Sequence, residues 1–289
     1  MQLNITDIIK KVKQIEIRSR KKSEAMLMGQ YHSAMKGQGM TFSEVRPYQF
    51  GDEIRRIDWN KTARFREPYV KVMEEERELT VMLMVDISAS MDYGTKTALK
   101  RELVAEICAS IGFSASGNND KVGLILFADK VYKMIPPQKG RKHILAIVSQ
   151  ILTAEYIPTP TNVDVALQYL MNVFKKKSFV FMFSDFDDAL DKRTLAVVSK
   201  KHSMLGLRIY DEKDNEIPDV GYALFQDAET GQEFWVNTSN RRWRYQFAEH
   251  QREKLKQLQE QFESTSAGFL NISSEGDYVK ALYQYFQKR

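Results

Sequence analysis

Short apolar runs alternate with longer segments of helical periodicity over residues 79–289. The runs at residues 81–85, 122–127 and 179–183 contain almost no polar side chain. Such runs are typical of parallel strands that are buried on both faces of a sheet. The pattern also predicts strands at residues 131–135, 204–210 and 268–272.

Between these strands, apolar residues recur every three or four positions, which predicts helices. The helical segments are residues 99–111, 144–152, 163–174, 245–263 and 277–287. Strands that alternate with helices favour parallel strands joined by helical crossovers. The sequence therefore predicts an α/β fold, with a mainly parallel, Rossmann-like sheet and helices on both faces.

The first 78 residues lack this regular alternation of strands and helices, and they are predicted to form an extension of the α/β domain at residues 79–289. Residues 5–34 predict a helix with a basic face, and two strands near residues 40–48 and 67–73 are expected to pair through the turn at Gly51 and Asp52. A β-hairpin insertion is predicted near residues 218–239, where two apolar segments flank a polar turn.

Composition and charge narrow the protein class without deciding the function. The chain has 289 residues, a net charge of +5 and a single cysteine, Cys108, which excludes an internal disulfide. No apolar run approaches the roughly 20 residues that span a bilayer, and the first residues lack a signal-peptide layout. A cytoplasmic protein is therefore predicted, and its basic N-terminal helix also permits peripheral association with the inner membrane.

Oxygen-bearing side chains follow two predicted strands and one loop. They are Asp86, Ser88, Ser90, Thr161 and Asp185. Ligands of open α/β sheets bind beyond the carboxyl ends of the strands, so these side chains are expected to meet there. Two carboxylates with three hydroxyls suit Mg²⁺, with Mn²⁺ or Ca²⁺ as alternatives. The competing interpretation is that Ser88 and Ser90 cap a helix and Asp185 only forms a turn.

The order Asp-x-Ser-x-Ser, then Thr, then Asp resembles the metal-ion-dependent adhesion site of von Willebrand factor A domains. The resemblance implies a von Willebrand factor A-like fold in which Asp86, Ser88, Ser90, Thr161 and Asp185 hold the metal. It also implies that a protein partner donates an acidic residue to the metal.

A second resemblance covers nearly the whole chain. Residues 37–48, 51–60, 63–64, 74–77 and 227–231 are similar to the bacterial family known as domain of unknown function 58. That resemblance implies a MoxR-type AAA+ ATPase as partner, with this chain as its adaptor. Many members of the family carry membrane helices, whereas this sequence has no such run.

The segments that resemble this family, called its signature below, contain a second set of candidate residues: Arg46, Tyr48, Gly51, Asp52, Arg55, Asp58, Trp59 and Arg64. These charges and the aromatic ring fit an exposed docking surface for a partner. They fit equally a buried ion-pair network that fixes the extension to the core. We favour the structural interpretation, with Trp59 as a core anchor.

A metal-dependent protein-interaction module, not an enzyme, is thus the predicted function. A metal-dependent phosphoesterase is the first alternative, because carboxylates and one ion can polarise a phosphoryl group. A membrane-surface scaffold that uses the N-terminal basic helix is the second. The basic and aromatic residues 241–245 could stack on nucleic acid, but a loop-to-helix junction explains them as well, and nucleic acid is not the expected partner.

Overall fold

The computed structural model describes residues 10, 12–16, 19, 40–75, 78–92, 99–188, 190–226 and 231–287. The helix predicted over residues 5–34 lies largely outside these residues. The short pieces that are described there are helical at residues 10, 12–16 and 19.

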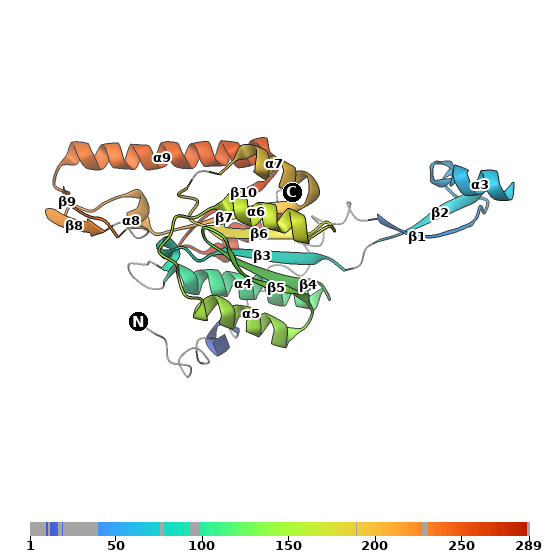
Figure 1. Ribbon diagram of the computed structural model, residues 1–289, viewed down its shortest axis with the longest axis horizontal. Helices are drawn as coiled ribbons and strands as arrows, with labels where there is room; N and C mark the ends of the chain where they lie inside the picture. Colours follow the sequence, from blue (N-terminus) through green and yellow to red (C-terminus); the bar gives the residue numbers. More distant parts are fainter. Residues whose placement is uncertain are drawn as a thin grey trace.

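A six-stranded sheet forms the centre of the molecule, in the order β10-β7-β6-β3-β4-β5 (Figure 1). Its strands are β3 (Thr80–Asp86), β4 (Lys121–Phe127), β5 (Val131–Gln138), β6 (Phe179–Ser184), β7 (Ser203–Tyr210) and β10 (Gly268–Ser273). All neighbours are parallel except the edge strand β5, which is antiparallel to β4. The first of these six strands along the chain, β3, lies in the middle of the sheet, as in doubly wound folds.

Helices cover both faces of the sheet, which confirms the predicted fold class. They are α4 (Lys100–Gly117), α5 (Arg141–Thr153), α6 (Val163–Val173), α7 (Lys192–Lys201), α9 (Arg241–Ser264) and α10 (Tyr278–Gln287). The core of one face joins α4, α5 and α10 to strand residues such as Leu83. The core of the other face joins α6, α7 and α9 to Met82 and Met84. Successive side chains of β3 thus enter opposite cores, as the period of a strand requires.

One close approach of α9 to the sheet depends on Gly206 in β7. A Cβ atom at this position would lie 2.5 Å from Cε1 of Phe262. We expect Gly206→Ala to lower the free energy of unfolding by about 1–3 kcal/mol, because overpacking displaces the buried ring. Urea unfolding followed by circular dichroism measures this change. In Gly276→Ala, whose Cβ would come no closer than 3.3 Å to a neighbour, the loss should be smaller.

Before the sheet, the chain forms an arm that projects away from it (Figure 1). The arm consists of β1 (Met40–Pro47), the 3-10 turn η1 (Ile54–Arg56), α3 (Trp59–Phe65) and β2 (Tyr69–Glu75). Its strands β1 and β2 pair in antiparallel fashion. Among the described arm side chains Val70 is the buried apolar one, so the arm has little core of its own.

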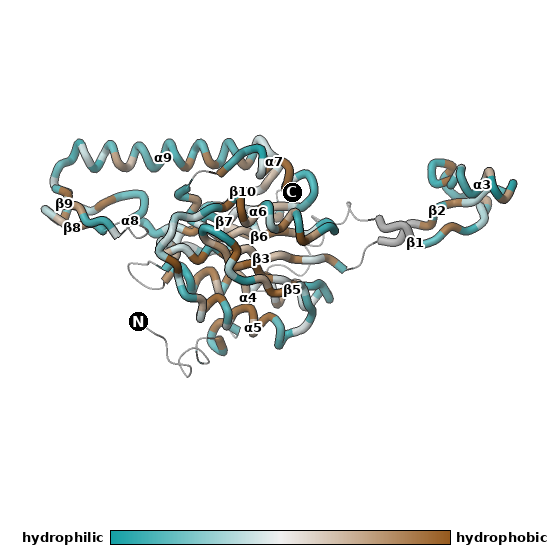
Figure 2. Tube along the Cα trace, in the orientation of Figure 1, coloured by the Kyte–Doolittle hydropathy of each residue, from teal (hydrophilic) through white to brown (hydrophobic). Residues whose placement is uncertain are grey.

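A second hairpin lies at the opposite end of the molecule from the arm, beside the N-terminal part of α9 (Figure 1). Its strands β8 (Tyr222–Gln226) and β9 (Glu233–Asn237) pair in antiparallel fashion, and the short helix α8 (Glu212–Asn215) precedes them. The hydropathy map gives α9 a mainly hydrophilic surface (Figure 2). None of the helices in the described part of the chain is both long and apolar enough to cross a membrane.

Candidate metal centre

Three chain segments meet where β3 and β6 end in the middle of the sheet. The segment after β3 is held to the loop before α6 by two backbone hydrogen bonds. Ala89 N donates to Ile157 O at 3.0 Å, and Ile157 N donates to Ile87 O at 2.9 Å. Because β3 and β6 are parallel neighbours, Asp86 and Asp185 follow at the same edge.

Asp86 is the centre of this group and has no solvent-exposed surface. Its Oδ1 accepts a hydrogen bond from Ser88 N at 2.8 Å, and Thr161 Oγ1 lies 3.2 Å from its Oδ2. The hydroxyls of Ser88 and Ser90 are 3.0 Å apart. The turn after β3 therefore directs the oxygens of alternate residues to one side, and the loop before α6 adds a third hydroxyl.

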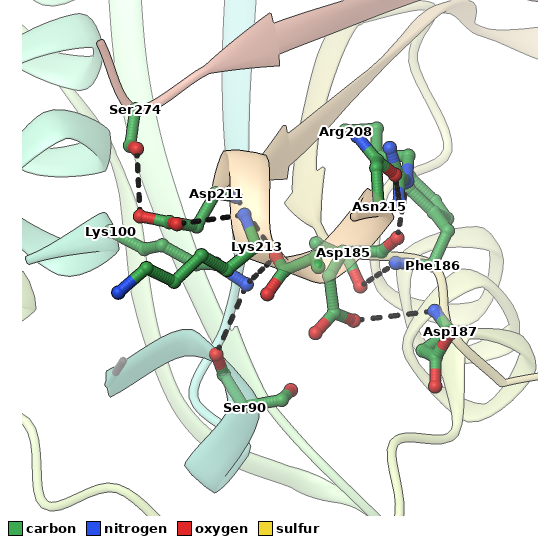
Figure 3. A network of polar contacts seen from close by, with 12 residues as sticks. Ser90, Lys100, Asp185, Phe186, Asp187, Arg208, Asp211, Lys213, Asn215 and Ser274 are labelled. Carbon is green, nitrogen blue, oxygen red and sulfur yellow. Dashed lines mark hydrogen bonds and ion pairs between the residues drawn. The ribbon is translucent and has the colours of Figure 1, made fainter. Parts of the chain in front are cut away.

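Asp185 completes the five residues that the sequence singled out. It is largely buried, and Asp187 N donates to its Oδ1 at 3.3 Å. Figure 3 shows its carboxylate pointing to the side on which Ser90 lies. The structure thus brings all five predicted residues to one edge of the sheet.

The electrostatics of the group favour a cation. Burial, and after it the negative charge of Asp185, raise the pKa of Asp86 to about 7. Among the residues that the structure describes, neither carboxylate forms an ion pair with a lysine or arginine. Two buried carboxylates that form no ion pair within the described residues, surrounded by hydroxyl oxygens, are a donor set that hard divalent cations fit.

Two polar residues of this group are not among the predicted ligands. Ser184 donates from Oγ to Asp86 Oδ2 at 2.6 Å, and its own Oγ accepts from Phe186 N at 3.0 Å. Asp188 Oδ2 accepts from Thr161 N at 2.7 Å and so holds the loop that carries Thr161. Ser184 is the last residue of a buried apolar strand, and its position beside Asp185 was the available signal.

The comparisons with known proteins decide the family. Residues 44–257 match the family model described as Protein of unknown function DUF58. This chain is a DUF58 protein. The uncharacterized protein Rv1480 of Mycobacterium tuberculosis is similar, with 33% identity over 220 residues, which cover 75% of this chain and 69% of the relative.

Solved structures with a similar arrangement are more distant. An aerotolerance-related membrane protein from Bacteroides fragilis matches with 16% identity and a TM-score of 0.48, over 73% of this chain and 100% of that one. The VWA domain of SpRpn10 matches with 10% identity and a TM-score of 0.38, over 71% of this chain and 93% of that domain.

The DUF58 signature residues lie in the arm, and several of them shape it. The Arg46 guanidinium donates to both carboxylate oxygens of Asp52, at 2.8 and 2.7 Å. This pairing lowers the pKa of Asp52 below its ordinary value. Asp58 caps α3 by accepting from Asn60 N and Lys61 N. Gly51, with φ of 106°, forms the turn that leads back along the arm.

The interpretation of Trp59 as a core anchor is wrong. Its side chain is 66% exposed at the start of α3, and Arg55 and Arg64 are exposed as well, whereas Tyr48 is half-buried. The sequence suggested burial because tryptophan is usually a core residue. The arm instead presents this ring to its surroundings, because it has almost no core in which to place it.

A second polar network of the DUF58 chain ties the candidate metal centre to α8 (Figure 3). The buried Lys100 ammonium donates to Ser90 O at 3.4 Å and pairs with Asp214 at 2.7 Å. Arg208 donates from Nε to Asp185 O at 3.2 Å and from a guanidinium nitrogen to Asn215 Oδ1 at 3.4 Å. Two of the three segments that carry the candidate ligands are therefore anchored to α8.

We expect Lys100→Met to lower the free energy of unfolding by about 2 kcal/mol, since Asp214 would lose its partner in a partly buried position. The same variant should weaken divalent-ion binding, because the backbone at Ser90 loses its anchor. Urea unfolding and calorimetric titration measure the two effects. Lys254→Met is the matched control, because its pair with Asp187 is exposed and should contribute less than about 1 kcal/mol. Equal losses in both variants would contradict the anchoring role.

Proposed function

We propose that this DUF58 protein is a divalent-metal-dependent protein-interaction module. Asp86, Ser88, Ser90, Thr161 and Asp185 would hold one Mg²⁺, or Mn²⁺ or Ca²⁺ in its place. The observation that carries the proposal is the buried, unpaired carboxylate of Asp86 with hydroxyl oxygens of Thr161 and Ser184 within 3.2 Å. A bound cation would supply the ion-pair partner that neither Asp86 nor Asp185 has among the described residues.

The same donor set supports a role in binding partners. Five protein oxygens of this kind leave room in an octahedral shell for an oxygen from outside the chain. The outside oxygen that we expect is the carboxylate of a protein partner, as the resemblance to von Willebrand factor A domains implies. For the partner itself we propose a MoxR-type AAA+ ATPase, with this chain as its adaptor.

A capture experiment tests the proposal. The immobilised chain should retain a purified MoxR-type AAA+ ATPase in Mg²⁺ and lose it in chelator, and Asp86→Ala should not retain it in either buffer. Asp187→Ala is the matched control, because it removes an exposed carboxylate two residues from Asp185 and should leave capture unchanged. Equal capture by wild type and Asp86→Ala would refute metal-dependent binding of the partner.

No catalytic step is part of this proposal, although a phosphoesterase uses related chemistry. A screen of phosphoester substrates with Mg²⁺ or Mn²⁺ separates the two functions. Turnover that disappears in Asp185→Ala, but not in Asp187→Ala, would favour the enzyme over the interaction module.

A further inference from the structure

The β8–β9 hairpin carries three large apolar side chains on one face. Leu224 lies directly opposite Trp235 in the register of the two strands, and Tyr222 precedes Leu224 by two positions. Residues in these positions share a face of a two-stranded sheet. The side chains of Tyr222 and Trp235 are 74% and 70% exposed, and that of Leu224 is 47% exposed. Contiguous exposed apolar side chains of this kind mark interaction surfaces.

The opposite face of the hairpin is partly covered. Ala223, Phe225 and Val236 are half-buried, whereas Phe234, which stacks on Phe225 with ring centroids 6.1 Å apart, is 49% exposed. The base of the hairpin is also fixed, because Thr238 Oγ1 donates to Gly221 O at 2.7 Å and accepts from Val220 N at 2.9 Å. The exposed face is therefore held in place by the rest of the hairpin.

Two exposed arginines follow the hairpin in the chain. Arg241 and Arg242 are the first two residues of α9, and they come four and five residues after Asn237, the last residue of β9, which pairs with Tyr222. Neither forms an ion pair within the described ranges of the chain. Basic residues at the start of a helix are unfavourable because they face the positive end of the helix dipole. An acidic partner would compensate this cost.

The hairpin belongs to the same edge of the molecule as the candidate metal centre. Arg208 joins Asp185 to Asn215 of α8, and Tyr222 follows Asn215 by seven residues. Seven residues reach at most about 25 Å. One partner with an interface of ordinary size, about 800 Å² on each side, can therefore touch both surfaces.

We propose that the exposed face of the hairpin (Tyr222, Leu224 and Trp235) and the two arginines (Arg241 and Arg242) form a second contact surface for the partner. The partner is an acidic protein segment with large apolar side chains. One of its carboxylates reaches the metal, and its apolar side chains cover the hairpin. This inference rests on the proposed function, since it assumes that the partner binds at the candidate metal centre.

Selection of peptides from a displayed random library on the wild-type chain in Mg²⁺ tests the inference. The enriched peptides should combine Asp or Glu with Leu, Phe or Trp. Their affinity, measured by fluorescence polarisation, should fall at least about tenfold in the double variant Leu224→Ser, Trp235→Ser, as expected for loss of an apolar anchor. Arg241→Ser with Arg242→Ser should also weaken binding, and Mg²⁺ titration of both double variants should match wild type.

The double variant Phe50→Ser, Phe65→Ser is the matched control, because it removes two exposed aromatic side chains of the arm that are not among the candidate docking residues. It should bind the peptides as wild type does. Equal losses in the arm and hairpin variants, or no enriched peptide at all, would overturn the inference.

Failure of the hairpin inference can be told apart from failure of the proposed function. If chelator abolishes peptide binding but the hairpin variant binds the peptides normally, the hairpin contact is overturned and the metal-dependent function stands. If peptide binding persists in chelator but is lost in the hairpin variant, the metal-dependent function is contradicted instead. If labelled oligo(dT) binds and the arginine variant abolishes that binding, the surface serves nucleic acid and the inference is overturned.

Discussion

Asp86→Ala should reduce the affinity for Mg²⁺ and Mn²⁺ by more than about 100-fold, because loss of a residue that only orients a metal ligand already costs up to about 100-fold. Asp86 lies at the centre of the site and is the residue to which Ser88, Thr161 and Ser184 all donate hydrogen bonds. Its removal takes away both a negative charge and the group that orients the hydroxyls. Isothermal titration calorimetry measures the change.

Two controls make this result specific. Asp187→Ala should bind the ion as wild type does, because its carboxylate is exposed and pairs with Lys254. Circular dichroism of Asp86→Ala should match that of wild type, because the buried apolar side chains of β3 are unchanged. If Asp86→Ala and Asp187→Ala bind Mg²⁺ with the same affinity, Asp86 is not a ligand.

The metal-free chain should gain stability from Asp86→Asn, and the gain should grow with pH. Burial and the charge of Asp185 raise the pKa of Asp86 to about 7, whereas the unfolded value is about 3.9. The folded state therefore holds the proton more tightly between these values, and stability falls as the pH rises through that interval. The neutral amide does not ionise, so the variant escapes this loss.

Urea unfolding in chelator measures this difference at pH 5 and pH 8. The advantage of Asp86→Asn over wild type should be larger at pH 8 by about 2–3 kcal/mol, which corresponds to about two pKa units. Added Mg²⁺ should stabilise wild type and not the variant, because only the native wild-type site would bind it. If the stability advantage of Asp86→Asn does not depend on pH, the raised pKa of the buried Asp86 carboxyl is contradicted.

Much of the fold could be predicted from the pattern of apolar residues. The runs at residues 81–85, 122–127 and 179–183 are strands buried on both faces, and two alternating segments of 218–239 form the hairpin. The helix α7 (Lys192–Lys201) did not stand out, because only Leu195 and Val198 are buried in it. A helix that contributes two apolar side chains to the core has little periodicity to detect.

The polar partners of the site were harder to predict than its candidate ligands. Asp86, Ser88 and Ser90 follow one strand at a recognisable spacing. Lys100, by contrast, is separated from Asp214 by more than a hundred residues, and the three-dimensional packing alone brings them within 2.7 Å. Trp59 was misjudged for a related reason, since residue type suggests burial but the arm offers no core to receive the ring.

Anomalous scattering from crystals of the wild-type chain grown with Mn²⁺ tests the central claim most directly. We expect one strong peak at the carboxyl ends of β3 and β6, about 2.1–2.3 Å from oxygens of Asp86 and the serines that follow it. A Mn²⁺ peak held by other residues, with the side chains of Asp86, Ser88, Ser90, Thr161 and Asp185 directed away from one another, would contradict the account.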